Sequence, residues 1–323
     1  MPATMENTNV NTTISTLETT GLNKTFFDKA LLEYAKKKLV YAEYGVKKRI
    51  PKNHGKKIEM RRWVPFDVND ALAPLTEGVT PEGLTLDQDI VEAVIEQYGA
   101  YFIYSDKLNL TTYDEIVQSG VRRLGELMGD VADHVVRDEL CNGTNVMYGG
   151  SADSRANITA NDKLSIDLIQ KAVIELETLK APKFTRNGQS HYKCIIHPKA
   201  KYDLWNDPKW ESANTYVNQE KLYSGEIGRM YGCVFIVADN APILAAGDGN
   251  SVPVYQSVIF GDDSYATVDI GGSGAIKSYI NPIGQAGFDP LHQRGTVGAK
   301  IEAFTAKILN EDWVLRLEHA ASL

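Results

Sequence analysis

The feature that most constrains the fold is the stretch from residue 112 to 140, which the pattern predicts to be one amphipathic helix. Its apolar residues alternate between spacings of four and three, namely Val117, Val121, Leu124, Met128, Val131 and Val135. Thr112 precedes Glu115 by three residues, as in a capping box, and Asn142-Gly143 is a common stop. At about 1.5 Å per residue, the helix is roughly 40 Å long, so the chain must spread along a rod.

The predicted helix contains three glycines, although each costs about 1 kcal/mol relative to alanine in a helix interior. Gly125 and Gly129, with Val121 and Ala132, form a strip of small residues along one side, and Gly120 is the third glycine. We expect another backbone to cross close to Gly125 and Gly129. The alternative is that a stable helix simply tolerates them.

The charges of this helix favour a structural role. Asp133 and Arg137 have the i,i+4 spacing of an ion pair. Asp130, His134 and Asp138 share one face, which we interpret as solvated in preference to metal-binding.

Composition restricts the class of protein. The 323 residues are 43% hydrophobic and 24% charged, so they can bury a large core in one elaborated domain or two. The net charge of −8 argues against wholesale wrapping of nucleic acid. Three cysteines without CxxC spacing predict buried, reduced thiols in an intracellular fold. We expect neither a membrane span nor a signal peptide, because the chain has no long apolar run and no basic start.

Charge is divided sharply between two neighbouring segments. Residues 36–62, the basic segment, contain eleven Lys or Arg against two Glu, a net of +9. Residues 63–106, the acidic segment, contain nine acids and no Lys or Arg, a net of −9. Three interpretations stay open: nucleic-acid binding by the basic segment, ordinary solvated faces, or pairing of the two segments within one arm or between subunits.

We prefer pairing, since the basic segment lacks the interleaved aromatic residues of a stacking platform and the acidic segment would repel phosphate. The candidates for contacts between subunits are Lys47, Lys48, Arg49, Lys56, Lys57, Arg61, Arg62, Asp67, Asp70, Glu77, Glu82, Asp87 and Asp89.

The remaining elements suggest an extended excursion and a separate α/β unit. A Thr- and Asn-rich arm precedes a helix from Asn23, residues 57–63 alternate like a strand, and a long loop leads to strands over 91–104. Helices over 165–180 and from Pro198 alternate with short apolar strands between residues 161 and 280. Residues 297–303 and 313–318 alternate on both sides of a turn and predict an antiparallel hairpin against the long helix.

Catalytic spacings are missing from the sequence. It has no GxSxG elbow, phosphate-binding GxxxxGK[ST] loop or HExxH pair. Asp239, Asp248 and Asn250 form a loose oxygen cluster that misses the calcium-loop spacing, so we interpret it as polar turns. His197, before a proline, is expected to be a loop histidine satisfied by backbone. We therefore expect no enzyme, no cofactor and no metal.

Four stretches together resemble the major capsid proteins of tailed bacteriophages, the Hong Kong 97-type fold, and most closely the podophage-type family. They are IPKNHGKKIEMRRW (50–63), LTEGVTPEG (75–83), EQYGAYFIYSDKLNLTTYDE (96–115) and DPLHQRGTVGAKIEAFTAKIL (289–309). The resemblance covers about residues 22–320. Ala299 stands where a larger residue is expected, a small departure from the pattern.

The resemblance implies an α+β fold in four parts. Residues 1–45 form an N-terminal arm and helix, and 46–106 an extended two-stranded loop lying over a neighbouring subunit. Residues 107–160 and 289–323 form a peripheral domain with the long spine helix, and 161–288 an α/β axial domain around five- and six-fold axes.

The resemblance also implies a function, which is to build the icosahedral head shell around double-stranded DNA. The partners would be many copies of the chain in pentamers and hexamers, scaffold, portal and decoration proteins, and DNA bound without sequence specificity. Assembly would occur in the host cytoplasm and the product would be the virion. Two alternatives stay open: an encapsulin-like compartment loaded with protein cargo, and a metal-dependent hydrolase using the region from Asp239 to Asp248.

Overall fold

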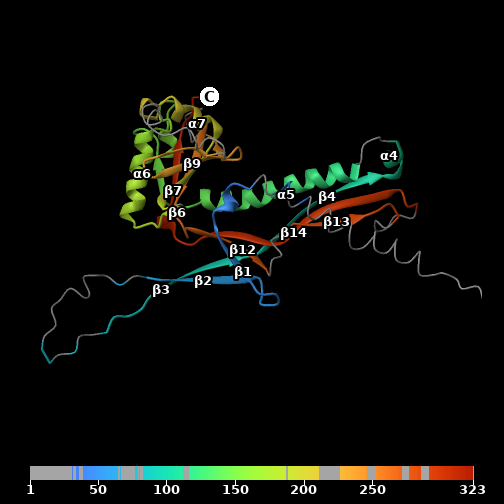
Figure 1. The fold of residues 1–323 in the computed structure, drawn as a ribbon, viewed down its shortest axis with the longest axis horizontal. Coiled ribbons are helices and arrows are strands. Elements are labelled where there is room, and N and C mark those ends of the chain that lie inside the picture. The colour runs from blue at the N-terminus through green and yellow to red at the C-terminus, as the bar shows by residue number, and fades with distance from the viewer. Residues whose placement is uncertain are drawn as a thin grey trace, which may run out of the picture.

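Helix α5 (Ile116–Cys141) is the axis of the structure, and it joins a compact domain at one end to a long sheet along its side (Figure 1). The computed structural model describes residues 31, 34–35, 39–64, 66, 77–78, 80, 83–111, 116–186, 188–210, 226–245, 252–270, 276–284 and 291–322. The predicted capping box, Thr112 to Glu115, lies outside them. Within the described residues, no helix is long and apolar enough to cross a membrane.

One face of α5 is buried as the periodicity predicts, with a shift in its second half. Val121, Leu124 and Met128 are buried, but the stripe continues through Ala132 and Val136, whereas Val131 and Val135 are only half-buried. The reason is geometric: apolar spacings of four and three average 3.5 residues, whereas a straight helix turns every 3.6, so the buried face drifts along the sequence.

The long sheet packs against α5 and is centred on β14 (Arg294–Ile308). The first half of β14 lies between β4 (Glu96–Ser105) and β13 (Lys277–Asn281), both antiparallel to it. Its second half pairs with β12 (Tyr265–Ile270), which pairs in parallel with β1 (Val46–Ile50). The short helix α4 (Asp106–Thr111) follows β4 at the far end of the sheet (Figure 1).

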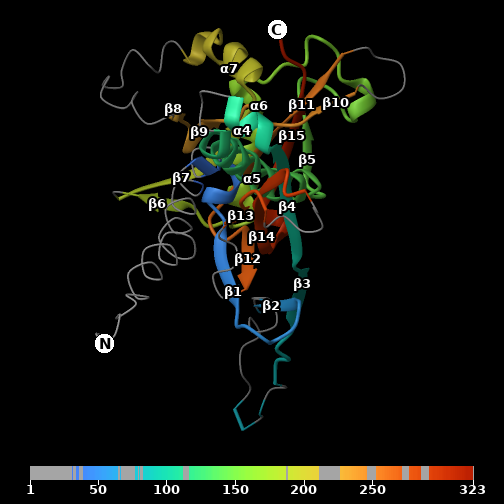
Figure 2. The same ribbon diagram turned by 90° about the vertical axis from the view of Figure 1, so that its right-hand side faces the viewer.

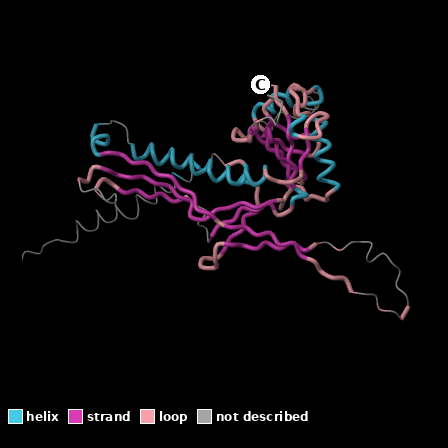
Figure 3. Tube along the Cα trace, turned by 180° about the vertical axis from the view of Figure 1, so that it is seen from behind, coloured by secondary structure: helices cyan, strands magenta, loops and turns pink. Residues whose placement is uncertain are grey.

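Strands β2 (Lys57–Trp63) and β3 (Gln88–Val94) form a separate antiparallel ribbon. We call residues 57–94 the hairpin arm. The arm leaves the long sheet at the end opposite α4 and projects away from the body (Figures 1 and 3). Figure 2 shows the arm at one extreme of the molecule and α7 (Pro198–Trp205) at the other.

The compact domain is an eight-stranded sheet with α6 (Ile166–Thr178) packed against it. The order is β5 (Val146–Tyr148), β15 (Val314–His319), β11 (Val254–Phe260), β7 (Gln189–Ile196), β9 (Cys233–Val237) and β8 (Glu226–Met230). Strands β10 (Ile243–Leu244) and β6 (Phe184–Arg186) pair with β11 and β7. Three 3₁₀ turns complete the described elements, Tyr41–Glu43, Arg155–Asn157 and Glu311–Trp313.

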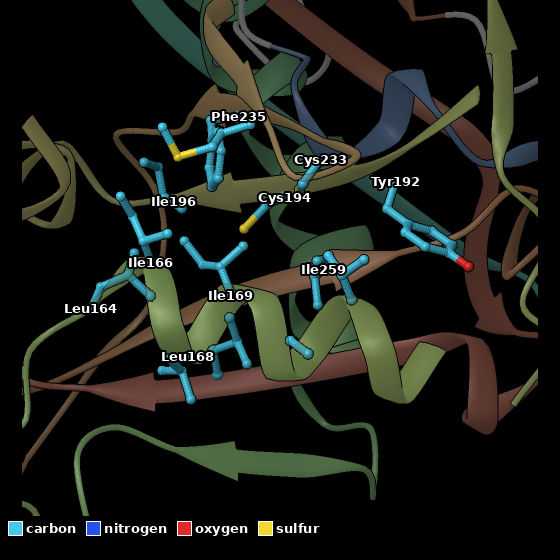
Figure 4. Packing of buried hydrophobic residues seen from close by; sticks show 14 of the residues in the cluster. Leu164, Ile166, Leu168, Ile169, Tyr192, Cys194, Ile196, Cys233, Phe235 and Ile259 are labelled. Carbon is cyan, nitrogen blue, oxygen red and sulfur yellow. The ribbon is translucent and has the colours of Figure 1, made fainter. Parts of the chain in front are cut away.

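The core of the compact domain is apolar and close-packed (Figure 4). Ile169 of α6 and Ile259 of β11 are both buried there, with Cys194 and Cys233 beside them. All three cysteines, including Cys141, are free and buried. The prediction of buried thiols is therefore confirmed, and burial raises the pKa of the Cys141 thiol to about 12.

Several local predictions are confirmed. The second amphipathic helix is α6, and its Ser165 side chain accepts a hydrogen bond from Leu168 N at 3.3 Å, as an N-cap should. His197 caps α7, where its Nδ1 accepts from Lys199 N at 3.1 Å. The strand predicted over 57–63 is β2.

The predicted terminal hairpin is wrong. β14 and β15 flank a turn, yet they enter different sheets: β14 pairs with β4, β13 and β12, whereas β15 pairs with β11 and β5. The expected axial range, residues 161–288, also does not coincide with one sheet, because β12 and β13 fall within that range and lie in the long sheet. Alternation marks a half-buried strand but carries no information about its partner.

A second feature of the compact domain is a buried ladder of three rings. His319 is fully buried, its Nε2 lies 2.9 Å from Ser257 Oγ, and its Nδ1 lies 2.8 Å from the carbonyl oxygen of Ala320. The ring of Tyr255 lies between those of His319 and His197, at centroid distances of 6.3 and 5.0 Å. Burial lowers the pKa of His319 to about 4, with the nearby charge of Asp203 opposing it, and burial also lowers the pKa of His197.

The unassembled subunit should therefore lose stability in mild acid. A histidine whose folded pKa is below its unfolded value of about 6.5 contributes stability above pH 6.5, and this is lost as the pH falls towards 4. The expected loss from His319 is about 3 kcal/mol. Urea unfolding at pH 7, 5.5 and 4.5 measures it, with His319→Gln as the control that should flatten the dependence. If the free energy of unfolding fell equally with pH in the wild-type chain and in His319→Gln, His319 would not be the cause of the loss.

Candidate subunit interface

The hairpin arm brings part of the basic segment against part of the acidic segment. Its register places Arg62 opposite Asp89, with Arg62 Nη2 2.7 Å from Asp89 Oδ2. Lys57 Nζ lies 3.1 Å from Glu92 Oε2. Each such exposed pair contributes roughly 0.2–1 kcal/mol. Part of the opposite charge of the basic and acidic segments is thus paired within the arm itself.

The other candidate residues form long ion pairs or none among the described residues. Arg49 lies 3.7 Å from Asp269 on the neighbouring strand, and Arg61 lies 3.5 Å from Glu59 on its own strand. Lys47, Lys48 and Lys56 are exposed, and none of them has an ion pair among the described residues. Glu77 and Asp87 are likewise exposed. Asp67, Asp70 and Glu82 lie outside the described residues.

The arm also exposes large apolar side chains, which charge counting had not revealed. They are Trp63 at 58%, Phe66 at 52%, Leu84 at 48%, Leu86 at 53% and Ile90 at 49% exposure. Several large apolar side chains exposed on one projecting ribbon make the arm a candidate contact surface, because soluble monomers rarely leave large apolar patches open to water. The sequence signal that could have found them is the apolar residues that interrupt the acidic segment.

The base of the arm is anchored to the long sheet. Met60 and Ala93 face the body and are buried with Ile50, Val268 and Ala303. The ladder therefore projects from a fixed base, and its outer part has no cover from the described residues. A rigid base with an uncovered end suits a segment that binds another molecule.

The glycines of α5 lie where a second segment crosses it. A Cβ on Gly125 would lie 2.8 Å from Leu31 O, and one on Gly129 would lie 2.6 Å from Ala35 O. A Cβ on Gly120 would overlap the ring of Phe102 on β4. Such distances exclude any side chain at these positions unless the neighbour moves. The crossing segment is the helical turn that contains Leu31 and Ala35.

Replacing Gly125 by leucine should therefore destabilise the subunit by about 2 kcal/mol, the usual cost of overpacking. The new side chain would displace the backbone at Leu31. Urea unfolding of the unassembled chain measures the effect. Ser119→Leu, on an exposed position of the same helix, is the matched control. Equal unfolding midpoints for the two variants would contradict the close crossing.

Asp133 forms a junction between three parts of the chain. It is fully buried, its Oδ1 accepts from Val40 N at 2.8 Å and from Ala42 N at 3.0 Å, and its Oδ2 accepts from Asn240 Nδ2 at 2.8 Å. Burial raises the pKa of Asp133, while these donors oppose the rise. The carboxylate thus fixes the N-terminal segment and the compact domain onto α5.

The predicted ion pair between Asp133 and Arg137 is wrong. Arg137 instead lies 2.6 Å from Asp138 and donates from Nη1 to Asn240 O at 2.8 Å. Asp133 points to the buried side because it lies one turn beyond Gly129, on the same face. That placement was readable from the helical spacing and was missed.

Two groupings of side chains bear on the enzyme alternative in the described part of the chain. No three of its His, Cys, Asp and Glu side chains are grouped to hold a metal. Asp248 and Asn250 lie outside the described residues. Ser257 and His319 have the distance of a nucleophile and its base, but both are fully buried, so no substrate reaches them.

Comparison with solved structures identifies the fold. The capsid of Ralstonia phage GP4 matches with a TM-score of 0.71 at 16% identity, covering 89% of this chain and 92% of that one. The capsid of cyanophage Pam1 matches with a TM-score of 0.66 at 13% identity, covering 85% and 89%. The expected α+β architecture is confirmed: the chain has the Hong Kong 97-type fold of phage capsid subunits.

The same fold extends to a virus-like particle from Pyrococcus furiosus, with a TM-score of 0.51 at 18% identity, covering 91% of this chain and 99% of that one. No family model matches this chain, and no curated protein matches it by sequence. The similarity to capsid proteins is therefore detected by comparing backbones. The four stretches quoted in the sequence analysis had indicated the same fold.

Proposed function

We propose that this chain is the major capsid subunit of a tailed phage and self-assembles into the icosahedral head shell around a double-stranded DNA genome. The observation that carries the proposal is the hairpin arm, which projects from the body with uncovered apolar and charged side chains. The fold shared with phage capsids over most of both chains supports it. A surface built this way can be covered by another copy of the same chain.

Each part of the subunit then has a role in the shell. The compact domain gathers around the five- and six-fold axes of pentamers and hexamers. Helix α5 and the long sheet form the peripheral part, and the hairpin arm lies over a neighbouring copy. The proposed boundaries are those of the four parts above, with β1, β4, β12 and β13 assigned to the peripheral part and β5 and β15 to the axial domain, following the sheets.

The role is structural and non-enzymatic. Scaffold, portal and decoration proteins are candidate further partners, and packaged DNA is contained without sequence-specific binding. The net charge of −8 suits this, because a shell that bound the genome tightly would hinder its movement. Assembly takes place in the host cytoplasm, and the product is the virion.

Negative-stain electron microscopy and sedimentation of the purified chain test the proposal. We expect closed shells, tubes or rings of five and six copies. A uniform monomer at high concentration, also in the presence of the scaffold protein of the same phage, would contradict it.

An encapsulin-like compartment remains the second candidate, because the Pyrococcus furiosus particle has the same fold. The higher TM-scores of the phage capsids favour the head shell. The content of particles assembled in the native host separates the two functions. Nuclease-protected DNA supports the head shell, and a folded protein cargo supports the compartment.

A further inference from the structure

A second exposed apolar surface lies at the end of the long sheet opposite the hairpin arm, where β4 is followed by α4 (Figure 1). Its members are Ile103 of β4, Leu108 and Leu110 of α4, and Leu291. Leu110 and Leu291, at 83% and 73% exposure, are the most exposed large apolar residues in the described part of the chain. The loop of Leu291 is held against the start of α4 because Asp106 N donates to Gln293 O at 3.0 Å. We call these four residues the end patch.

The charges beside the end patch are mixed in sign. Asp106 lies at the start of α4, and its Oδ1 accepts from Lys107 N at 2.6 Å. Lys107 and Arg294 are exposed and basic. Neither an acidic nor a basic partner is therefore favoured, and the patch selects its occupant through apolar surface. Soluble chains rarely leave a large apolar patch open to water, so a cover for these residues is expected.

The course of the chain beside α5 indicates which segment can supply the cover. Leu31 crosses α5 at Gly125 and Ala35 crosses it at Gly129, so the two segments run in the same direction. Traced back from Leu31, the chain heads for the N-terminal end of α5, which is the end beside α4 (Figure 1). That end, Ile116, lies nine residues from Gly125, about 14 Å along the helix axis. The thirty residues that precede Leu31 thus reach α5 from the side of the end patch.

Residues 10–22 contain apolar side chains at a regular spacing. Val10, Ile14 and Leu17 follow one another by four and three residues, the spacing at which a helix presents one apolar face. Only Asn, Ser and Thr lie between them, so residues 10–17 carry no charge. Fourteen residues separate Leu17 from Leu31 and span up to about 45 Å when extended, well beyond the distance to the end of α5. Residues 10–22 therefore match the end patch in chemistry and in reach.

We propose that residues 10–22 cover the end patch of their own copy. Val10, Ile14 and Leu17 supply the apolar contacts, and the uncharged residues between them suit the mixed charges around the patch. The own copy is the partner because the described chain already leads to this end of α5. The contact concerns a single chain, so it goes beyond shell formation. Its consequence is that the unassembled subunit hides its most exposed apolar residues from water.

Photochemical cross-linking of the full-length, unassembled chain tests the proposal. Benzoylphenylalanine, a photoreactive amino acid, replaces Leu110 in an equal mixture of isotopically light and heavy copies, and mass spectrometry identifies the linked peptides. We expect links to residues 10–22 in which both peptides carry the same isotope. Links between light and heavy peptides would show that a second copy is the occupant, and absence of links to residues 10–22 would equally overturn the proposal. The same amino acid at Ile174, an exposed position on α6, is the control and should give no such link.

Hydrogen exchange supplies an independent readout. Ile14→Ser with Leu17→Ser should uncover the end patch, so the backbone amides of α4 should exchange at least about tenfold faster than in the wild-type chain. Thr12→Ser with Thr13→Ser changes neighbouring residues without removing a large apolar side chain, and it is the matched control. Equal exchange in the two variants would contradict the cover. Both readouts use the unassembled chain, so their failure leaves shell formation as a separate result.

Discussion

Reversing two arginines of the arm, Arg61→Glu with Arg62→Glu, is expected to abolish assembly while the subunit stays folded. The glutamate introduced at position 62 would face Asp89 directly across the ladder, and like charges in that position repel. The arm would also lose two of the positive charges that, on the proposed assembly, meet acidic residues of another copy. A loss of about 1.4 kcal/mol at each contact lowers its association constant tenfold, and a shell repeats that contact many times.

Sedimentation and electron microscopy report assembly, and circular dichroism reports folding. The fold should survive because the arm is anchored by Met60, Ala93 and their buried neighbours, which the change does not touch. The matched control is Arg62→Glu with Asp89→Arg, which restores the pair within the arm. If that exchange restores assembly completely, the assembly defect comes from losing the ion pair within the arm and not from losing a contact between copies. Normal particles from the original double variant would contradict charge complementarity altogether.

Replacing Asp133 by alanine is expected to be the most destabilising of the single changes discussed. Val40 N, Ala42 N and Asn240 Nδ2 would all lose their acceptor in a buried site. A buried donor left without a partner costs about 1–3 kcal/mol, so we expect a loss of about 3 kcal/mol or more. Urea unfolding measures the loss, and limited proteolysis between residues 39 and 45 should show that the N-terminal segment has detached.

Asp133→Asn is the control for this change. The asparagine keeps an oxygen for Val40 N and Ala42 N. Its amide nitrogen replaces the oxygen that faces Asn240 Nδ2, so the Asn240 amide must turn over to accept with Oδ1, which lacks a partner in the described structure. The substitution also removes the cost of burying a charge, the same burial that raises the pKa of Asp133. We expect Asp133→Asn to unfold within about 1 kcal/mol of the wild-type chain. An alanine variant as stable as the asparagine variant would contradict the junction.

Local patterns predicted the parts of the fold that depend on neighbouring residues. The long helix, α6 with its Ser165 cap and strand β2 all follow from spacing and capping within a few residues. The glycine strip pointed to the face of α5 on which Leu31 and Ala35 cross. In these cases the physical cause lies within one or two turns of the chain.

The sheet partners could not be predicted in the same way. β14 is fifteen residues long because its two halves pair with different strands, and β15 leaves it for the compact domain. Both arrangements depend on residues far away along the chain. β1 was missed because the three basic residues between Val46 and Ile50 hide its alternation.

The candidate interface was predicted from charge alone, and exposed apolar side chains of the arm now add to it. Lys57 and Arg62 form ion pairs with acidic residues of the same arm, so part of the charge is neutralised within one copy. The exposed leucines and Trp63 add contact area that a count of acids and bases does not reveal. For Asp133 the prediction was wrong in the other direction. Its charge was interpreted as part of an ion pair on the helix surface, but the side chain is buried and holds three segments together.

Cryo-electron microscopy of the assembled chain tests the central claim most directly. The account predicts a closed shell of pentamers and hexamers, in which the arm of each copy, residues 57–94, lies on a different copy from its own body. The compact domains should surround the five- and six-fold axes. Monomers or small oligomers in which the arm contacts only its own chain would contradict it.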